Sequence, residues 1–220
     1  MELNISKSPL ITVIIAVYNR SKKLQRAVNS VLSQTYTNFE IIVVDDGSSD
    51  NPERYIFRLI EKGFNIKYIK HSNRGTPLSL NEGIKLASGK YITFLDSDDR
   101  YMPEHLEQRV RVFKKFRGPD LIHTTAKIYG SENDMLIPDA RNPEKLIHIE
   151  KCIIGATIFG IKKVFETMKG FRDIYGYDYD FMRRCRKKFR TVKYDLPTYI
   201  YYRNSGDSIL SKKKLLYDSK

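Results

Sequence analysis

The chain has 220 residues, 41% of them hydrophobic, which suffices for one domain with a core of its own. Its formal net charge of +13 favours polyanionic partners, such as phosphate-bearing substrates, an anionic membrane surface or nucleic acid. The 2 cysteines, Cys152 and Cys185, lack metal-site spacing, and no apolar run approaches the roughly 20 residues of a membrane helix. Because a signal-peptide pattern is also missing, we expect a cytoplasmic protein, peripheral at most to the inner membrane surface.

The positive charge is concentrated toward the carboxyl terminus. Residues 162–220 contain 16 Lys and Arg residues against 7 Asp and Glu residues. The densest cluster consists of Arg183, Arg184, Arg186, Lys187, Lys188 and Arg190. Such a surface either binds an anionic partner or is a solvated basic face without one.

The first half of the chain alternates apolar strands with amphipathic helices. The predicted strands are 10–17, 39–44, 65–70 and 91–95, and the predicted helices between them are 21–34, 52–62 and 77–87. Ser21 is the expected N-cap of the first helix. This alternation predicts right-handed crossovers and a mostly parallel sheet with helices on both faces.

The second half is less regular. The predicted helices are 103–116, 162–168 and 178–189, and the predicted β segments are 120–129 and 192–202. The polar stretch 130–149 is interpreted as a small hairpin that reaches over the site. We expect a loose basic tail at the end of the chain.

Residues 90–103, KYITFLDSDDRYMP, end a strand in a cluster of carboxylates. Three carboxylates in four positions repel one another, so they require a compensating charge. If the strand geometry continues, Asp96 and Asp98 point to the same side. Carboxylate oxygens suit Mg²⁺ or Mn²⁺, with phosphate oxygens at the remaining positions. The stretch predicts a divalent-cation site, and the alternative is a turn with an Asp cap before the next helix.

Polar residues follow three of the predicted strands where each ends. Tyr18 and Asn19 follow the first strand, residues 45–46 the second, and residues 96–99 the fourth. In open parallel sheets, ligands bind outside the carboxyl ends of the strands. We therefore expect these clusters to converge at one edge, which favours a ligand site over a simple turn.

Seven segments resemble glycosyltransferase family 2 and occur in that family's order. They are VIIAVYNR, SVLSQTY, FEIIVVDDGSSD, NRG, LNEGIKLASGKYITFLDSDD, GYDYDFMRR and YRNSGDS. The resemblance implies an α/β fold of the GT-A type, with a mostly parallel central sheet flanked by helices. It further implies one domain over residues 1–220, with a Rossmann-like nucleotide-sugar-binding half at about 8–119, an acceptor half at about 120–205 and a basic tail at 206–220.

The resemblance also implies a donor site and a cofactor. The donor would be a nucleotide-diphospho-sugar, with UDP favoured, and the cofactor a Mn²⁺ or Mg²⁺ ion held by Asp98 with Asp96 in support. The implied nucleotide-sugar-binding residues are Ala16, Tyr18, Asn19, Asp46, Arg74, Asp96 and Ser97. Tyr18 would flank the base, Asp46 would accept from the N–H edge of uracil, and Arg74 would lie near the diphosphate. Without the resemblance, Tyr18 would be predicted as a core aromatic and Asp46 as a turn former.

Asp178 falls where the family has its catalytic base, so the resemblance implies that it takes the proton of the acceptor hydroxyl. The alternative role is an N-cap of the helix that follows. Two positions depart from the family pattern: Tyr177 stands in place of a Glu, and Ser205 in place of a His. These departures put acceptor recognition and any phosphate or metal contact of that His in doubt.

We predict an inverting, metal-assisted glycosyltransferase of polysaccharide or glycolipid biosynthesis, with a saccharide or lipid-linked acceptor. A basic face beside the acceptor site would hold it against an anionic membrane. One alternative is a nucleotidyltransferase, although no Gly-rich phosphate loop follows the first strand. Another is a binding module for polyanions or membranes, which the acid clusters argue against, as they argue against nucleic acid as a partner.

Overall fold

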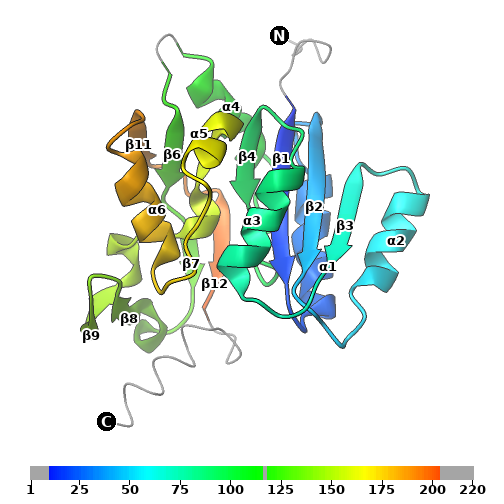
Figure 1. The fold of residues 1–220 in the computed structure, drawn as a ribbon, viewed down its shortest axis with the longest axis horizontal. Helices are drawn as coiled ribbons and strands as arrows, with labels where there is room; N and C mark the ends of the chain where they lie inside the picture. Colours follow the sequence, from blue (N-terminus) through cyan, green and yellow to red (C-terminus); the bar gives the residue numbers. More distant parts are fainter. Residues whose placement is uncertain (1–9, 116–117, 204–220) are drawn as a thin grey trace.

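The computed structural model describes residues 10–115 and 118–203, which form a sheet covered by helices on both faces (Figure 1). The central sheet has 7 strands in the order β11-β6-β10-β4-β1-β2-β3. Their bounds are β1 Ile11–Val17, β2 Phe39–Asp45, β3 Ile66–Lys70, β4 Tyr91–Phe94, β6 Leu121–Thr124, β10 Phe159–Ile161 and β11 Thr191–Tyr194. β10 runs antiparallel to both neighbours, and the other pairs are parallel. The predicted α/β fold with a mostly parallel sheet is confirmed.

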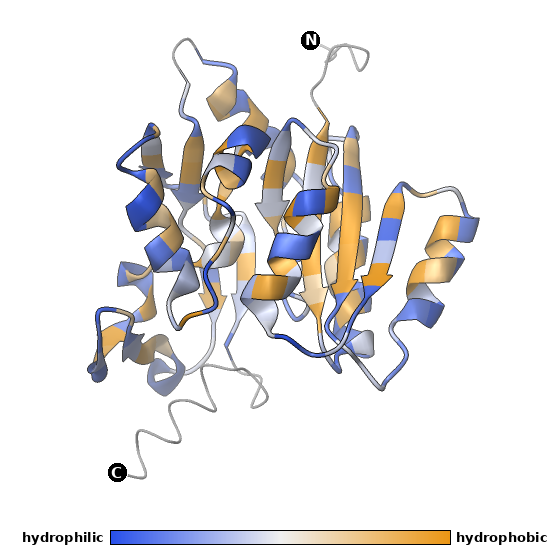
Figure 2. Ribbon diagram, in the orientation of Figure 1, coloured by the Kyte–Doolittle hydropathy of each residue, from blue (hydrophilic) through white to orange (hydrophobic). Residues whose placement is uncertain are grey.

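The helices divide between the two faces of this sheet. One face carries α1 Ser21–Leu32, α2 Glu53–Glu61 and α4 His105–Phe113, and the other carries α3 Thr76–Leu86, α5 Lys162–Thr167 and α6 Tyr177–Cys185. In β1, Val13 and Ile15 pack toward the first group and Ile14 toward the second, because successive side chains point to opposite faces. A strand covered on both sides is apolar throughout, as the orange colour of β1 and β2 in Figure 2 shows.

Two predicted β segments each divide between different sheets. The segment 120–129 contains β6 and β7 Lys127–Tyr129, and the segment 192–202 contains β11 and β12 Tyr199–Tyr202. β12 lies between β7 and the two-residue strand β5 Arg100–Tyr101 in a separate 3-stranded sheet. A run of β-forming residues gives no sign of where the chain changes sheets, so the extent predicted for a strand at 120–129 was wrong, whereas the β character predicted for 192–202 is confirmed.

A hairpin within residues 130–149 was predicted and is confirmed. It consists of β8 Leu136–Asp139 and β9 Asn142–His148, which pair antiparallel. Short 3-10 helices flank it at Glu132–Met135 (η2) and Ile149–Lys151 (η3), and another, η4, covers Gly155–Thr157 before β10. The hydroxyl of Tyr175 donates to the carbonyl oxygen of Pro138 in the hairpin at 2.6 Å, which ties the hairpin to the segment before α6.

Two predicted helix caps are wrong. Arg20 is the N-cap of α1, and Ser21 is its first helical residue, with a backbone N–H that donates to Asp50 Oδ2 at 2.7 Å. Gly176, at φ 68°, is the N-cap of α6, so Asp178 lies inside the first turn. A left-handed conformation costs Gly little, which explains why it ends the preceding loop. α6 also ends at Cys185 rather than at the predicted residue 189.

The basic cluster of residues 183–190 lies at the far end of α6 from Asp178. The side chain of Arg184 is fixed within the fold, since its Nε donates to Asp180 Oδ2 at 2.8 Å. The carbonyl oxygen of Arg190 accepts hydrogen bonds at the amino end of β6, whereas α6 begins at the opposite edge of the sheet (Figure 1). The basic cluster therefore lies at the edge of the sheet opposite the start of α6, and both a basic face beside the acceptor site and contact with a membrane stay predictions.

The described residues include no helix with the length and apolar character needed to cross a membrane. The predicted tail at 206–220 and Ser205 lie outside the described residues, as does the predicted end of the helix 103–116. The division into halves at about 8–119 and 120–205 stays a prediction.

Candidate functional site

Loops from several strands meet at the carboxyl edge of the central sheet. β1 is parallel to β2 and to β4, so the loops that begin at Tyr18, Asp46 and Leu95 leave the sheet on the same side. β10 is antiparallel to β4, which brings η4, just before β10, to this edge as well. The sequence clusters that were expected to converge are thus brought together by the topology.

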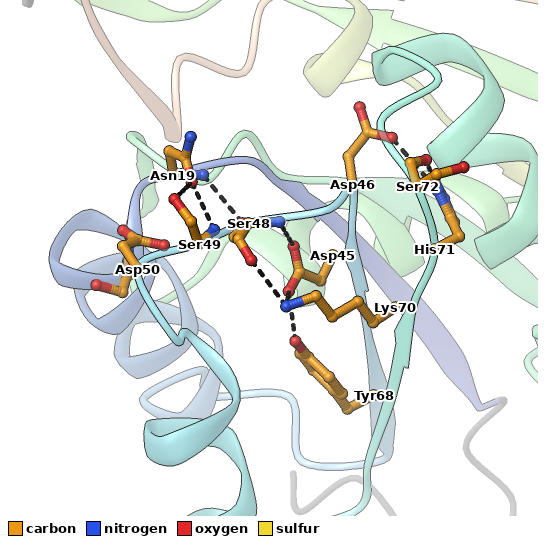
Figure 3. A network of polar contacts seen from close by, with 11 residues as sticks. Asn19, Asp45, Asp46, Ser48, Ser49, Asp50, Tyr68, Lys70, His71 and Ser72 are labelled. Carbon is orange, nitrogen blue, oxygen red and sulfur yellow. Dashed lines mark hydrogen bonds and ion pairs between the residues drawn. The ribbon is translucent and has the colours of Figure 1, made fainter.

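The loop after β1 is held by side chains of the loop after β2 (Figure 3). Asn19 has a left-handed backbone, with φ 51°, which Asn adopts more readily than most residues. Its Oδ1 accepts from the Ser49 backbone N–H at 2.8 Å, and its own N–H donates to Ser48 Oγ at 3.0 Å. Tyr18, just before it, is 48% exposed, so it is no core aromatic. Ala16 is half-buried in β1, near the start of this loop.

Asp45 fixes the start of the second loop from inside the fold (Figure 3). Its carboxylate is buried and accepts from the Ser48 N–H at 2.7 Å and from the Tyr68 hydroxyl at 2.5 Å. Burial alone would raise the pKa of Asp45, but these hydrogen bonds and the charge of Lys70 lower it below its ordinary value. Asp45 therefore stays ionised and holds the loop in place.

Asp46 faces the segment between β3 and α3. Its Oδ1 accepts from the backbone N–H of Arg74 at 2.7 Å, and its Oδ2 from that of Gly75 at 2.9 Å. His71 Nδ1 lies 3.4 Å from Oδ1 (Figure 3). The side chain of Arg74 is 41% exposed, 3.6 Å from Glu82. Asp46 thus braces the loop that carries Arg74, and each of its oxygens retains a lone pair for a further donor.

The acidic loop after β4 is a turn and not a continued strand. β4 ends at Phe94, and the Asp99 N–H donates to the Asp96 carbonyl oxygen at 3.1 Å. The expectation of strand geometry through Asp98 is therefore wrong. Burial first and the charge of Asp98 second raise the pKa of Asp96 to about 7. Ser97, between them, is buried.

The third carboxylate of the loop has a structural role. Asp99 is buried, with Oδ2 accepting from the Tyr199 hydroxyl at 2.6 Å and Oδ1 from the Tyr202 N–H at 2.8 Å. Burial raises its pKa well above the ordinary value, and the charges of Asp96 and Asp98 add to this effect. Asp99 therefore joins the acidic loop to β12, and with 0% of its surface exposed it is not placed to bind a ligand.

Asp178 reaches the same edge from the first turn of α6. Its Oδ2 accepts from the Gly155 N–H of η4 at 3.1 Å, and its Oδ1 from the Tyr179 N–H at 2.8 Å. Burial raises the pKa of Asp178 to about 6, although these hydrogen bonds oppose the shift. η4 lies at the carboxyl edge of the sheet, so the hydrogen bond from Gly155 places Asp178 there too, and its negative charge is one of the causes that raise the pKa of Asp96.

Tyr177, which stands where the resemblance leads one to expect Glu, packs into the fold. Its ring meets that of Phe171 edge to face at a centroid distance of 5.3 Å. Burial raises the pKa of Tyr177 well above its ordinary value, so its hydroxyl stays protonated. Tyr177 therefore cannot act as a second base beside Asp178.

Asp96 and Asp98 are the two carboxylates of the acidic loop that are candidates for binding a divalent cation. In the described part of the chain, no group of 3 or more His, Cys, Asp or Glu residues could hold a metal ion. Mg²⁺ is commonly bound by one or two carboxylates together with substrate phosphates and water, and Mn²⁺ accepts the same oxygen ligands. The pair fits that mode, in which a bound diphosphate completes the coordination, and not a cage made by protein alone.

Two further residues of the site were missed by sequence reasoning. Arg20 forms an ion pair with Asp98 at 2.7 Å, and Tyr199 holds Asp99 from the last strand. A basic residue directly after Asn19 was a visible signal for Arg20, since it follows a strand on the same edge as the acidic loop. Nothing in the local sequence distinguishes Tyr199 from its neighbouring tyrosines.

Comparisons with known proteins show the family to which this chain belongs. Residues 12–172 match the family described as "Glycosyl transferase family 2". An uncharacterized glycosyltransferase of Rickettsia prowazekii is 32% identical over 184 residues, which are 79% of this chain and 57% of that protein. An uncharacterized glycosyltransferase of Nostoc sp. is 40% identical over 131 residues, 59% of this chain and 40% of that protein. The matched part of the chain thus spans 57% of the first relative and 40% of the second.

Solved structures with the same fold have low sequence identity. S. aureus TarS 1–349 in complex with UDP superposes with a TM-score of 0.71 at 21% identity, covering 87% of this chain and 60% of that one. The mannosyltransferase PcManGT from Pyrobaculum calidifontis, in complex with GDP-Man and Mn²⁺, gives a TM-score of 0.71 at 17% identity, covering 89% and 57%. At these identities the likeness shows the fold.

Proposed function

Since the chain belongs to glycosyl transferase family 2, we propose that it transfers a sugar from a nucleotide-diphospho-sugar to an acceptor hydroxyl with inversion at the anomeric carbon. The observation that carries the proposal is that Asp96, Asp98 and Asp178 all lie at the carboxyl edge of the sheet. They come from two distant segments, and a fold that gathers like charges needs a cationic or proton-accepting use for them.

The donor nucleotide would lie over the loops after β1 and β2. The exposed ring of Tyr18 offers a stacking surface for a base, and Asp46 has lone pairs to accept an N–H of uracil. The half-exposed guanidinium of Arg74 lies on the loop that Asp46 braces and is suited to the diphosphate. TarS has been crystallised with UDP and with UDP-GlcNAc, which supports a UDP-sugar here.

Replacing Asp46 by Ala is expected to weaken UDP binding by about tenfold or more, because a charge-assisted hydrogen bond to the base is lost. It should also lower the free energy of unfolding by roughly 1 kcal/mol, because the Arg74 and Gly75 N–H groups lose their acceptors. Isothermal titration with UDP and thermal unfolding measure the two effects separately. Asp46→Asn keeps one acceptor oxygen, so its UDP affinity and stability should lie between those of the wild type and Asp46→Ala. If Asp46→Ala loses stability but keeps its UDP affinity, the role of Asp46 is purely structural.

The divalent cation would be held by Asp98 and Asp96 together with the diphosphate of the donor. When bound, such an ion stabilises the negative charge that develops on the leaving diphosphate. PcManGT was solved with GDP-Man and Mn²⁺, which supports Mn²⁺ as the first ion to test. Asp99 would take no part in this, because it is fully buried and holds the loop to β12.

Asp178 would act as the general base. Its two hydrogen bonds, from Gly155 and Tyr179, fix the carboxylate and leave further lone pairs for the acceptor hydroxyl. The pKa of about 6 makes it a stronger base than an ordinary Asp while it stays mostly ionised at neutral pH. Proton transfer to Asp178 as the hydroxyl attacks the far face of the sugar would give inversion.

The proposed function is tested with a panel of nucleotide-sugars, with and without Mn²⁺. Binding to the folded state raises the melting temperature by mass action, so the correct donor is expected to give the largest Mn²⁺-dependent rise. Release of the nucleoside diphosphate from that donor is then followed with saccharide and lipid-linked acceptors. If no nucleotide-sugar shifts the melting temperature at millimolar concentration, the chain is not a transferase of this kind.

The rate of transfer is expected to depend on pH through Asp178. Only the ionised carboxylate accepts a proton, so kcat/KM should rise roughly tenfold per pH unit below about 6 and level off above it. An ordinary Asp would place this rise near pH 4. The profile is measured at saturating Mn²⁺, since a cation on Asp96 favours the ionised form of that group. A rate that stays flat down to pH 4.5 would contradict the assignment of the base.

A further inference from the structure

The ion pair between Arg20 and Asp98 joins two loops that are far apart in the sequence. Arg20 Nη1 lies 2.7 Å from Asp98 Oδ2, and the two side chains are only 18% and 9% exposed. Arg20 directly follows Asn19, whose left-handed backbone is held by Ser48 and Ser49. The position of the guanidinium is therefore set by the fold and is not that of a free surface side chain.

Arg20 neutralises Asp98, the carboxylate that we propose as a ligand of the cation. Arg26 also reaches this loop, but it donates to the backbone carbonyl oxygen of Asp98 and leaves the carboxylate alone. In the absence of a ligand, Arg20 thus supplies the compensating charge for the acidic loop.

We propose that Arg20 is a resident counter-ion of Asp98 that couples cation binding to donor binding. A guanidinium and a divalent cation compete for the same carboxylate, so the nucleotide-free protein should bind the cation weakly. A donor diphosphate offers the guanidinium a second anionic partner of matching geometry. Asp98 is then released to the cation. This inference rests on the proposed function and adds that one side chain makes the two binding events cooperative.

The proposal has a thermodynamic consequence that needs no turnover. If the diphosphate strengthens Mn²⁺ binding by some factor, Mn²⁺ must strengthen diphosphate binding by the same factor. Removing Arg20 should raise the Mn²⁺ affinity of the nucleotide-free protein and thereby reduce that factor. A residue that only stabilised the fold would change neither the Mn²⁺ affinity of the nucleotide-free protein nor the factor by which the diphosphate strengthens Mn²⁺ binding.

The experiment is a Mn²⁺ titration followed by the electron paramagnetic resonance signal of free Mn²⁺. It uses the full chain without nucleotide and with UDP or GDP, corrected for Mn²⁺ bound by the nucleotide alone. Arg20→Gln is expected to tighten nucleotide-free Mn²⁺ binding by about tenfold, equivalent to 1.4 kcal/mol, and to lower the coupling factor equally. Lys22→Gln is the matched control, because Lys22 is exposed on the same helix and its loss changes the net charge equally.

The outcomes separate this inference from the proposed function. Equal Mn²⁺ affinities for Arg20→Gln and Lys22→Gln would overturn the role of Arg20 while UDP-dependent Mn²⁺ binding kept the proposed function intact. If the wild type binds no Mn²⁺ even with UDP or GDP, the metal assignment fails, and the role of Arg20 with it. Should Arg20→Gln not fold, Arg20→Lys carries the test, with an expected gain of about threefold because an ammonium lacks the planar fork. No gain in that variant would overturn the proposal.

Discussion

Replacing Asp178 by Asn is expected to lower kcat by roughly 10²–10⁴-fold while leaving the affinity for the donor nearly unchanged. The amide keeps an oxygen that can accept from the Gly155 N–H, so α6 and η4 should stay in contact. It cannot take a proton at neutral pH, so only the transition state loses stabilisation. Steady-state kinetics gives kcat, and titration with UDP gives the donor affinity.

Asp173→Asn provides the matched control for this change, since Asp173 is an exposed carboxylate in the loop before α6. The control is expected to keep wild-type kinetics. An equal loss of donor affinity and of kcat in Asp178→Asn would instead mean that Asp178 organises the donor site. Unchanged kcat would remove Asp178 from the chemistry altogether.

Replacing Asp98 by Ala is expected to abolish Mn²⁺-dependent transfer, a loss of at least about 10²-fold, because the leaving diphosphate loses its electrostatic stabilisation. Folding should survive, since the freed guanidinium of Arg20 is 18% exposed and can be solvated, and repulsion within the acidic loop falls. The measurements are the rate with and without Mn²⁺ and the melting temperature.

Asp99→Asn is the contrasting variant, because it changes the neighbouring carboxylate that serves the fold. Asn replaces one of the two acceptor oxygens by an NH2 donor, so one of the hydrogen bonds from the Tyr199 hydroxyl and the Tyr202 N–H is lost or reversed, and this variant is expected to lose stability. UDP-dependent Mn²⁺ binding should persist in it below its melting temperature. Wild-type turnover in Asp98→Ala would show that the metal assignment is wrong.

The first half of the fold could be predicted closely because its signals are local. The strand predicted at 39–44 is observed as Phe39–Asp45, and the helix predicted at 77–87 as Thr76–Leu86. Unbroken apolar runs and helical spacing define such elements within a few residues of sequence. The carboxyl ends of parallel strands then place the polar clusters at one edge, so most of the candidate site could also be expected.

The remaining features depend on contacts between distant residues. β5 has only two residues and exists because it pairs with β12 about a hundred positions later. The ion pair of Arg20 with Asp98 spans 78 positions, and no local pattern predicts it. Gly176, and not Asp178, is the N-cap of α6, and the carboxylate of Asp178 instead accepts hydrogen bonds from Gly155 and Tyr179. The irregular part after β6, where we expect the acceptor half, is also where the sequence patterns were least informative.

The anchoring of Asp99 by β12 also has a consequence for the order in which this protein matures. Tyr199 and Tyr202 close the acidic loop from a strand some hundred residues further along the chain. A ribosome-bound chain that has emerged only as far as Asp99 has both carboxylates of the proposed cation site, Asp96 and Asp98, but lacks the partner that fixes their loop. Contacts between residues so far apart in the sequence form slowly, because closing the long intervening loop costs conformational entropy before the contacts contribute stabilisation. We therefore expect donor-binding competence to arise late, after synthesis has passed Tyr202, and not with the emergence of the nucleotide-binding half.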